Sequence, residues 1–166
     1  MLHYRLAIFD FDGTLADSLP WFRASFQDMI TRFDLAPVRD DEVAEVYHPV
    51  MTYVSMTRPG IARGPHEHID QADYFCFAGP SDFKVYLWDN RPDSPTYKNK
   101  LTVVAGESEP MVVIVPKNVV HAYKNVGDIE GLVINCPNRL FKGEGKKEPV
   151  DEVRHESDPS SPYRLD

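Results

Sequence analysis

The pattern of apolar and polar residues changes near residue 46. In the first 45 residues, a short apolar run at 5–9 is followed by four apolar residues at helical spacing: Phe22, Phe26, Met29 and Phe33. This pattern predicts a strand and then a helix over 19–33. The sequence therefore begins with a short α/β segment.

The rest of the chain carries the pattern of a β protein. Short runs rich in Val, Tyr, Phe and Thr are separated by Pro, Gly, Asn and Asp, which is typical of strands joined by turns. The predicted strands cover 50–57, 61–67, 72–78, 82–89, 98–105, 111–116, 119–124 and 130–136. Closely spaced strands without a long amphipathic helix indicate a sandwich, barrel or jelly roll.

Composition sharpens this division of the chain. Of the 14 prolines among 166 residues, only Pro20 and Pro37 precede residue 46, and the last part of the sequence is charged and interrupted by prolines. We expect a strand-plus-helix fragment over 1–45, a β domain over 46–140 and an irregular tail over 141–166. The β domain is long enough to bury its own core, whereas the fragment is not.

Charge and hydropathy exclude several classes of protein. A net charge of −8 argues against nucleic acid or an anionic membrane surface as a partner. No apolar run is long enough for a membrane span, and the N-terminus lacks a signal-peptide pattern, so we expect a cytoplasmic protein. Cys76 and Cys136 lie in apolar runs and are expected to be buried, reduced thiols.

An acidic motif occupies residues 8–18, which read IFDFDGTLADS. It resembles the first motif of the haloacid dehalogenase superfamily. The resemblance implies that Asp10 attacks a phosphoryl group, that Asp12 carries the proton and that Mg²⁺ lies beside them. The repeated βα units that would complete such a site are missing after residue 46. We therefore favour a family remnant, with a Mg²⁺-dependent phosphatase as an alternative.

Three histidines in the β region have informative spacing. His66 and His68 are two residues apart, so they share one face of a strand, and His121 would enter from another strand. Together with the carboxylate of Asp73, the three imidazoles would suit a divalent transition metal such as Mn, Fe, Ni or Zn. The spacing therefore predicts a functional site rather than isolated structural histidines.

Two segments around these histidines resemble the cupin motifs. Residues 60–79 resemble the first motif, with Asp73 where that motif has Glu. Residues 116–125 resemble the second, with Asn118 in place of a glycine, and Asn tolerates a positive φ better than other non-glycine residues. The resemblance implies that the mainly β domain is a cupin jelly-roll β-sandwich.

A closer resemblance runs over most of residues 50–137, with a weak echo near Ser157, so that it spans about 46–166. Residues 62–66 (ARGPH), 89–96 (DNRPDSPT) and 115–122 (VPKNVVHA) are similar to the dTDP-4-dehydrorhamnose 3,5-epimerase family. Those enzymes are metal-free cupins, usually dimers, that act on a nucleotide-linked 4-keto-6-deoxy sugar. The resemblance implies no cofactor, His66 as the base that removes the proton next to the ketone, and Arg63 as a substrate anchor.

Some positions depart from this family's pattern. His68 and Asp73 stand where the family has Gln and Lys, and the region of Asn138 and Arg139 lacks the family's proton-donating tyrosine. The first two changes resemble the metal-binding cupin pattern instead.

These resemblances point to a set of site residues. We predict His66 and His121 as catalytic residues, and a substrate-binding set made of Arg63, His68, Lys84 and Tyr123. By strand alternation, however, Lys84 and Tyr86 are first expected to lie on a solvated sheet face.

The sequence thus favours an epimerase-like or isomerase-like cupin that acts on a sugar nucleotide, as a homodimer. Three alternatives stay open. The first is a divalent-metal cupin of dioxygenase or isomerase type that uses the four-residue metal set. The second is the phosphatase built on the N-terminal motif, and the third is a non-catalytic sugar-binding cupin.

Overall fold

The computed structural model describes residues 49–166. The chain divides into two compact units, Met1–Tyr47 and His48–Asp166, and the second contains every described residue. The predicted strand and helix of the first 45 residues lie outside the described residues, as do Asp10 and Asp12.

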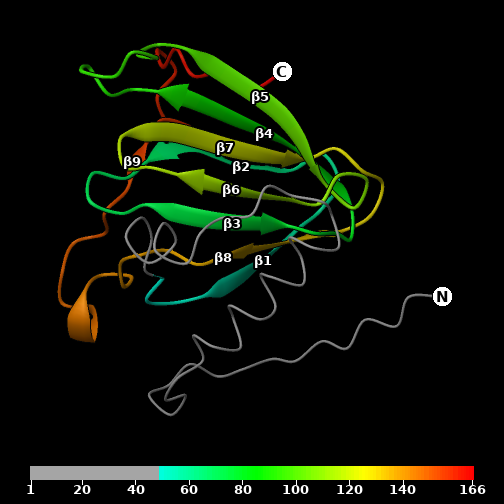
Figure 1. The fold of residues 1–166 in the computed structure, drawn as a ribbon, viewed down its shortest axis with the longest axis horizontal. Coiled ribbons are helices and arrows are strands. Elements are labelled where there is room, and N and C mark those ends of the chain that lie inside the picture. The colour runs from blue at the N-terminus through cyan, green and yellow to red at the C-terminus, as the bar shows by residue number, and fades with distance from the viewer. Residues whose placement is uncertain (1–48) are drawn as a thin grey trace. The chain divides into compact units, whose positions relative to one another are not determined.

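Residues 49–166 contain nine strands and one short 3-10 helix (Figure 1). In chain order they are β1 Tyr53–Thr57, β2 Ala62–Glu67, β3 Asp73–Phe77, β4 Asp82–Asp89, β5 Lys100–Gly106, β6 Met111–Val115, β7 Val119–Asn125, β8 Gly131–Asn135, η1 Glu144–Lys146 and β9 Val153–Arg154. Each of the eight predicted strands has its counterpart among β1 to β8.

The strands form two antiparallel sheets (Figure 1). One has four strands in the order β1-β8-β3-β6, and the other has five in the order β5-β4-β7-β2-β9. Apart from β4 and β5, the strands that lie side by side in each sheet are not consecutive in sequence, which is the connectivity of a jelly roll rather than of a simple meander. The predicted mainly β cupin jelly-roll sandwich is confirmed.

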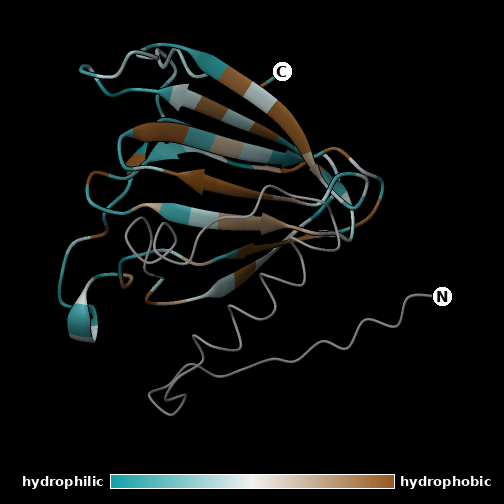
Figure 2. Ribbon diagram, in the orientation of Figure 1, coloured by the Kyte–Doolittle hydropathy of each residue, from teal (hydrophilic) through white to brown (hydrophobic). Residues whose placement is uncertain are grey.

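Aromatic side chains from both sheets meet in the main core. Phe75 on β3 contacts Tyr123 on β7, and Phe77 on β3 contacts both Tyr123 and Phe83 on β4, with ring centroids 5.6–5.7 Å apart. Burying each phenylalanine contributes about 1.5–3 kcal/mol to the fold. Figure 2 shows hydrophobic residues along both sheets and mostly hydrophilic loops, as expected when alternate strand positions face a shared interior.

A second apolar cluster lies on the other face of the five-stranded sheet. Tyr86, Trp88, Val120 and Ala122 pack there against Tyr163 and Leu165 of the tail. The prediction that Tyr86 belongs to a solvated face is wrong, because Tyr86 is 0% exposed. Strand alternation gave the correct face, but it could not show that a distant segment covers it.

The tail is more structured than the irregular segment predicted over 141–166. It contains η1 and β9, and β9 pairs with β2 so that Arg154 lies opposite His66. The carboxylate of Asp151 accepts three backbone N–H groups of the β2–β3 loop, from Ile69, Asp70 and Gln71, at 2.8–3.0 Å. The tail is thereby fixed beside the end of β2.

Two further predictions concern residues 49–166. Both cysteines are thiols outside any disulfide, as expected, although each is half-buried rather than fully buried. Burial raises the pKa of Cys76 to about 12, which makes it an unreactive thiol near neutral pH. Within these residues there is no helix with the length and apolarity needed to cross a bilayer.

Candidate functional site

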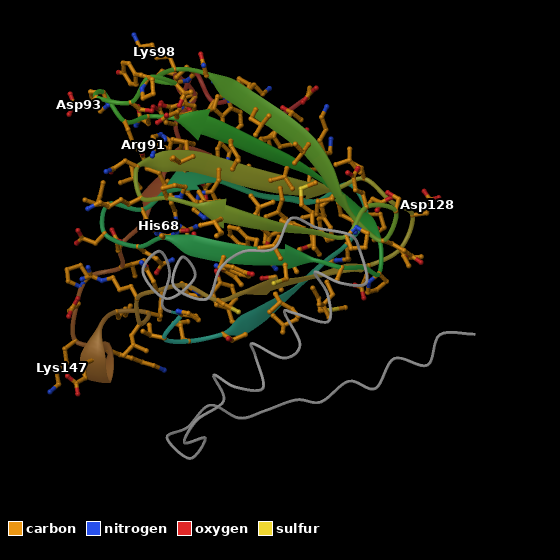
Figure 3. All side chains as sticks on the ribbon, in the orientation of Figure 1. His68, Arg91, Asp93, Lys98, Asp128 and Lys147 are labelled. Carbon is orange, nitrogen blue, oxygen red and sulfur yellow. The ribbon has the colours of Figure 1, made fainter. Side chains whose placement is uncertain are left out.

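Three histidines meet at one end of the sandwich. His66 lies on β2, and His68 is the first residue after the end of that strand. His121 on β7 is the register partner of His66. Their ring centroids are 4.4–5.6 Å apart, and one nitrogen from each lies within 4.8 Å of the others. Figure 3 places His68 at the edge of the molecule opposite to Asp128. We call His66, His68 and His121 the histidine cluster.

A glycine allows this close approach of β2 to β7. The register between the two strands shifts between Arg63 and His66, and Gly64 lies in that irregular step with φ of 79°. A Cβ at this position would lie 2.5 Å from the backbone oxygen of His121. Only glycine fits both the left-handed backbone and the short distance, so Gly64 helps to set the position of His66.

Backbone carbonyls fix the orientation of two imidazoles. The Nδ1 atom of His68 donates to the carbonyl of Asp151, and Nδ1 of His121 donates to the carbonyl of Val119 at 3.1 Å. A carbonyl can only accept, so these contacts select the tautomer with the proton on Nδ1. In both rings the Nε2 atom therefore presents a lone pair toward the cluster when the ring is neutral.

Both lone pairs face the same carboxylate oxygen. Asp73 Oδ2 lies 3.2 Å from Nε2 of His68 and 3.3 Å from Nε2 of His121. Its other oxygen, Oδ1, accepts hydrogen bonds from Gln71 and Asn135, each at 2.8 Å. Within residues 49–166, Asp73 Oδ2 and His121 Nε2 have no hydrogen-bond partner. Acceptors that face one another need a proton or another cation between them.

The charges at the site follow from these contacts. Burial alone would raise the pKa of Asp73, but its interactions with His121 and His68 outweigh that effect and hold the pKa well below its usual range. Burial lowers the pKa of His68, and its contacts with Asp73 and Asp151 reverse the shift, so the pKa lies above its ordinary value. The site thus holds an ionised carboxylate beside a histidine that accepts a proton readily.

His66 differs electrically from His68. Burial, reinforced by the neighbouring His121 and His68, lowers the pKa of His66 to about 3. Its imidazole is therefore neutral at physiological pH. The side chain is 17% exposed, so the ring is shielded but not sealed from solvent.

Sequence reasoning missed Glu152 as a site residue. Its carboxylate lies 3.6 Å from Nδ1 of His66, and it also pairs with Arg154 at 2.7 Å. Glu152 comes from the tail, where no periodicity or motif marked it. The sequence carried no signal that this segment returns to the histidines.

Arg63 on β2 and Tyr123 on β7 are register partners, as His66 and His121 are on the same two strands. The Arg63 side chain is exposed and donates to the backbone oxygen of Met56 and to Thr57 on β1, at 3.1 and 3.3 Å. Tyr123 is buried, with its ring 5.7 Å from that of Phe75, and burial raises the pKa of its hydroxyl. Arg63 therefore lies where a ligand can reach it, whereas Tyr123 lies in the core.

Lys84 is not brought to the histidine cluster. On β4 the register partner of His121 is Leu87, so the odd-numbered side chains share its face and Lys84 lies on the other face. Its Nζ atom pairs with the carboxylate of Asp166 at 2.6 Å. The prediction of Lys84 as a substrate-binding residue of this site therefore does not agree with its position.

Three further positions singled out in the sequence have clear local roles. Asn118 has φ of 58°, which confirms the expected left-handed turn. Asn138 accepts the backbone N–H of Ala72 at 2.8 Å, and Arg139 pairs with Asp70 at 2.9 Å. Asn138 and Arg139 thus serve loop structure at the place where the epimerase resemblance expects a tyrosine.

The fold is a two-sheet jelly roll. Its five-stranded sheet supplies the histidines and its four-stranded sheet supplies the carboxylate of Asp73, which together define a cupin-type site. Comparison with curated proteins finds a relative described as the probable low-salt glycan biosynthesis epimerase Agl13 of Haloferax volcanii. It is 39% identical over 102 residues, which cover 60% of this chain and 64% of the relative. The chain thus spans less than two thirds of that relative's length.

Solved structures share the fold. A dTDP sugar isomerase from Desulfovibrio desulfuricans has a TM-score of 0.62 and 21% identity, with 78% of each chain covered. The 4-keto-6-deoxy sugar epimerase NovW from Streptomyces spheroides has a TM-score of 0.59 and 21% identity, covering 74% of this chain and 61% of NovW. The structural neighbours are therefore proteins of the epimerase-like kind that the sequence resembles.

The N-terminal resemblance is also found independently. The family described as haloacid dehalogenase-like hydrolase matches residues 7–61, less than half of the chain. The matched residues include Asp10 and Asp12 and end within the described β region.

Proposed function

We propose that this chain is an epimerase or isomerase that acts on a nucleotide-linked 4-keto-6-deoxy sugar by removing a proton next to the ketone. One observation carries the proposal: His66, in the position that the resemblance assigns to the base, lies opposite His121 of β7 with its Nδ1 atom 3.6 Å from the Glu152 carboxylate. The curated relative named as an epimerase and the sugar-epimerase neighbours support the substrate class.

Each residue contributes a distinct part of this chemistry. The free lone pair of His66 accepts the proton, and negative charge moves onto the ketone oxygen. His68, whose pKa its partners raise, can donate to that oxygen, and His121 supports the same region. Arg63 offers an exposed guanidinium to the diphosphate of the sugar nucleotide.

Proton exchange tests this proposal directly. The protein is mixed in deuterated water with a dTDP-linked 4-keto-6-deoxy sugar, and the sugar protons next to the ketone are followed by NMR. We expect exchange in the wild type, loss of at least about 100-fold in His66→Ala, and no loss in His155→Ala. His155 is the matched control because it pairs with Glu67 instead of the cluster. Tight binding without exchange would favour the non-catalytic sugar-binding alternative.

A divalent metal centre is the second candidate function. The observation that favours it is that Asp73 Oδ2 and His121 Nε2 are buried 3.3 Å from each other without a hydrogen-bond partner in the described residues. His66, His68, Asp73 and His121 supply three nitrogens and one oxygen, which fits Mn, Fe, Ni or Zn. A metal held there would act as a Lewis acid toward a bound oxygen.

Metal analysis separates the two candidates. If the protein purifies with stoichiometric metal that His68→Ala removes, His68 is a ligand, the histidine cluster is a metal site and the metal-free epimerase proposal fails. If the protein holds no metal after incubation with each of the four cations, the second candidate fails. The same measurement on Lys84→Ala serves as control, because Lys84 lies on the other face of the sheet.

The proposal includes two finer points. The resemblance leads us to expect a homodimer, and the two reduced thiols lead us to expect the cytoplasm. The phosphatase alternative rests on Asp10 and Asp12 and stays a prediction, to be tested by Mg²⁺-dependent hydrolysis of a phosphate ester in the wild type and in Asp10→Asn.

A further inference from the structure

Inversion at a carbon next to a ketone needs two proton carriers. One removes the proton from the first face of the sugar, and another must deliver a proton to the opposite face. Among the residues described above, His66 serves the first role from β2, in the five-stranded sheet. The second group should therefore come from the four-stranded sheet and carry an O–H or N–H that is free to donate.

Tyr53 on β1 meets these requirements. Its register partner is Asn135, and the alternation of β1 puts Tyr53 on the same face as the buried Ser55 and Thr57. β1 and β2 belong to different sheets (Figure 1). Although the Tyr53 residue is 42% exposed overall, its hydroxyl reaches the Asn135 amide at 2.8 Å.

The hydrogen bonds around Asn135 define the role of this hydroxyl. The Asn135 Oδ1 atom accepts the backbone N–H of Tyr74, so the orientation of the amide is fixed. Its Nδ2 atom then donates to Tyr53 Oη and to Asp73 Oδ1, each at 2.8 Å. Because Tyr53 is the acceptor in this bond, its own hydrogen remains for donation. The same amide ties the hydroxyl to the carboxylate that faces His68 and His121.

We propose that Tyr53 is the proton donor opposite His66, a catalytic residue of the reaction given under Proposed function, on which this inference rests. His66 takes the proton from the carbon next to the ketone, and the electrons of that C–H bond form the enolate. The Tyr53 O–H bond then breaks as a new C–H bond forms on the other face, and the enolate returns to the ketone. Water takes the proton from His66 and returns one to the tyrosinate.

The surroundings of Tyr53 keep it protonated before reaction. Burial, together with the negative charge of Asp73 and of Glu152 and the neighbouring Tyr123 hydroxyl, raises the pKa of Tyr53 to about 12, against the opposing effect of the Asn135 hydrogen bond. The Tyr53 hydroxyl is therefore protonated throughout the physiological pH range.

The test separates proton removal from proton delivery. In deuterated water, NMR follows both the loss of the sugar proton and the appearance of the epimer. We expect Tyr53→Phe to keep the exchange within about threefold of wild type while epimer formation falls at least about 100-fold. His66→Ala should lose both signals. Tyr97→Phe removes the same hydroxyl from a tyrosine in the β4–β5 loop and should change neither.

The outcomes are distinguishable. Wild-type protein without exchange would overturn the proposed function and the role of Tyr53 with it. Exchange and epimer formation that both survive in Tyr53→Phe would overturn only the role of Tyr53. Loss of both signals in a folded Tyr53→Phe protein would show a positioning residue and would overturn the assignment as donor.

A second variant covers the case in which Tyr53→Phe does not fold. Replacing Tyr53 by 3,5-difluorotyrosine keeps the ring and lowers the pKa of the hydroxyl. The alkaline limb of the epimer-formation rate should then move to lower pH, because the donor loses its proton earlier. Asp73, Glu152 and Tyr123 are unchanged in this variant, so an unmoved limb would overturn the proposal.

Discussion

The Oδ2 atom of Asp73 lies 3.3 Å from Nε2 of His121, and neither atom has a hydrogen-bond partner within residues 49–166. The two atoms come from different sheets, so the contact joins the halves of the sandwich at the histidine cluster. Since the His121 proton is held on Nδ1 by the Val119 carbonyl, the contact sets a lone pair against a carboxylate. The arrangement is most stable when a cation lies near both atoms.

Removing the charge of Asp73 should therefore weaken metal binding. We expect Asp73→Asn to lower the affinity for Zn²⁺ or Co²⁺ by at least about 10-fold, since the variant loses the only carboxylate of the four-residue set. Isothermal titration calorimetry measures the change. Asp128→Asn makes the same substitution in an exposed turn at the far end of the molecule (Figure 3). Equal affinities in both variants would exclude Asp73 as a ligand.

Gly64→Ala should disturb the pairing of β2 with β7 at the register shift before His66. The added Cβ would meet the His121 backbone oxygen at 2.5 Å in a left-handed backbone. We expect a loss of about 3 kcal/mol or more in the free energy of unfolding. Gly60→Ala is the matched control, because Gly60 has φ of 74° but open space around it, and it should cost only about 1–2 kcal/mol. Urea denaturation measures both variants, and equal losses would contradict the close approach.

Strand alternation explains why most of this fold could be predicted. The period of two places His66 and His68 together and separates Phe83 from Lys84, and the structure keeps both relations. Pairing between distant strands is not encoded in that period. The role of Tyr53, for example, depends on its register with Asn135, and no local pattern indicates that β1 lies beside β8.

The tail shows the second limit of the sequence pattern. Asp151 and Glu152 reach the site through backbone capping and a two-residue strand, which leave no hydrophobic period to detect. Further along the tail, Tyr163 and Leu165 pack against the cluster that contains Tyr86, so a face that alternation marked as outward is buried. The sequence could indicate the inner histidines, but not the chain segment that returns to orient them.

Asp89 should make stability depend on acid pH. Arg91 holds its pKa well below the usual range, Ser94 and Thr96 add hydrogen bonds, and burial opposes the shift only in part. A folded-state pKa below the unfolded value of about 3.9 gives stability that is present above that pH and is lost as pH falls further. We expect Asp89→Asn to cost about 1–2 kcal/mol at pH 7, and the difference from wild type to shrink below about pH 4.

Urea denaturation at pH 7, 5 and 3 checks this dependence. Asp93→Asn, in the same loop but exposed, should show no such difference at any pH (Figure 3). A difference between wild type and Asp89→Asn that stays constant down to pH 3 would contradict the depressed pKa of Asp89.

Removing residues 163–166 should expose the second apolar cluster. Trp88 is 7% exposed, its ring centroid lies 5.7 Å from that of Tyr163, and Leu165 packs against the same cluster. Losing two partly buried apolar side chains should lower the free energy of unfolding by about 2 kcal/mol.

Because the chain has two tryptophans, the deletion is made in Trp21→Phe, so that fluorescence reports Trp88 alone. The emission should shift to longer wavelength as water reaches the indole. Lys84→Ala removes the ion pair with Asp166 and a cation–π contact with Tyr86, but it leaves Tyr163 and Leu165 in place and should leave the emission unchanged. An unshifted spectrum after the deletion would mean that Tyr163 and Leu165 do not shield Trp88 in solution.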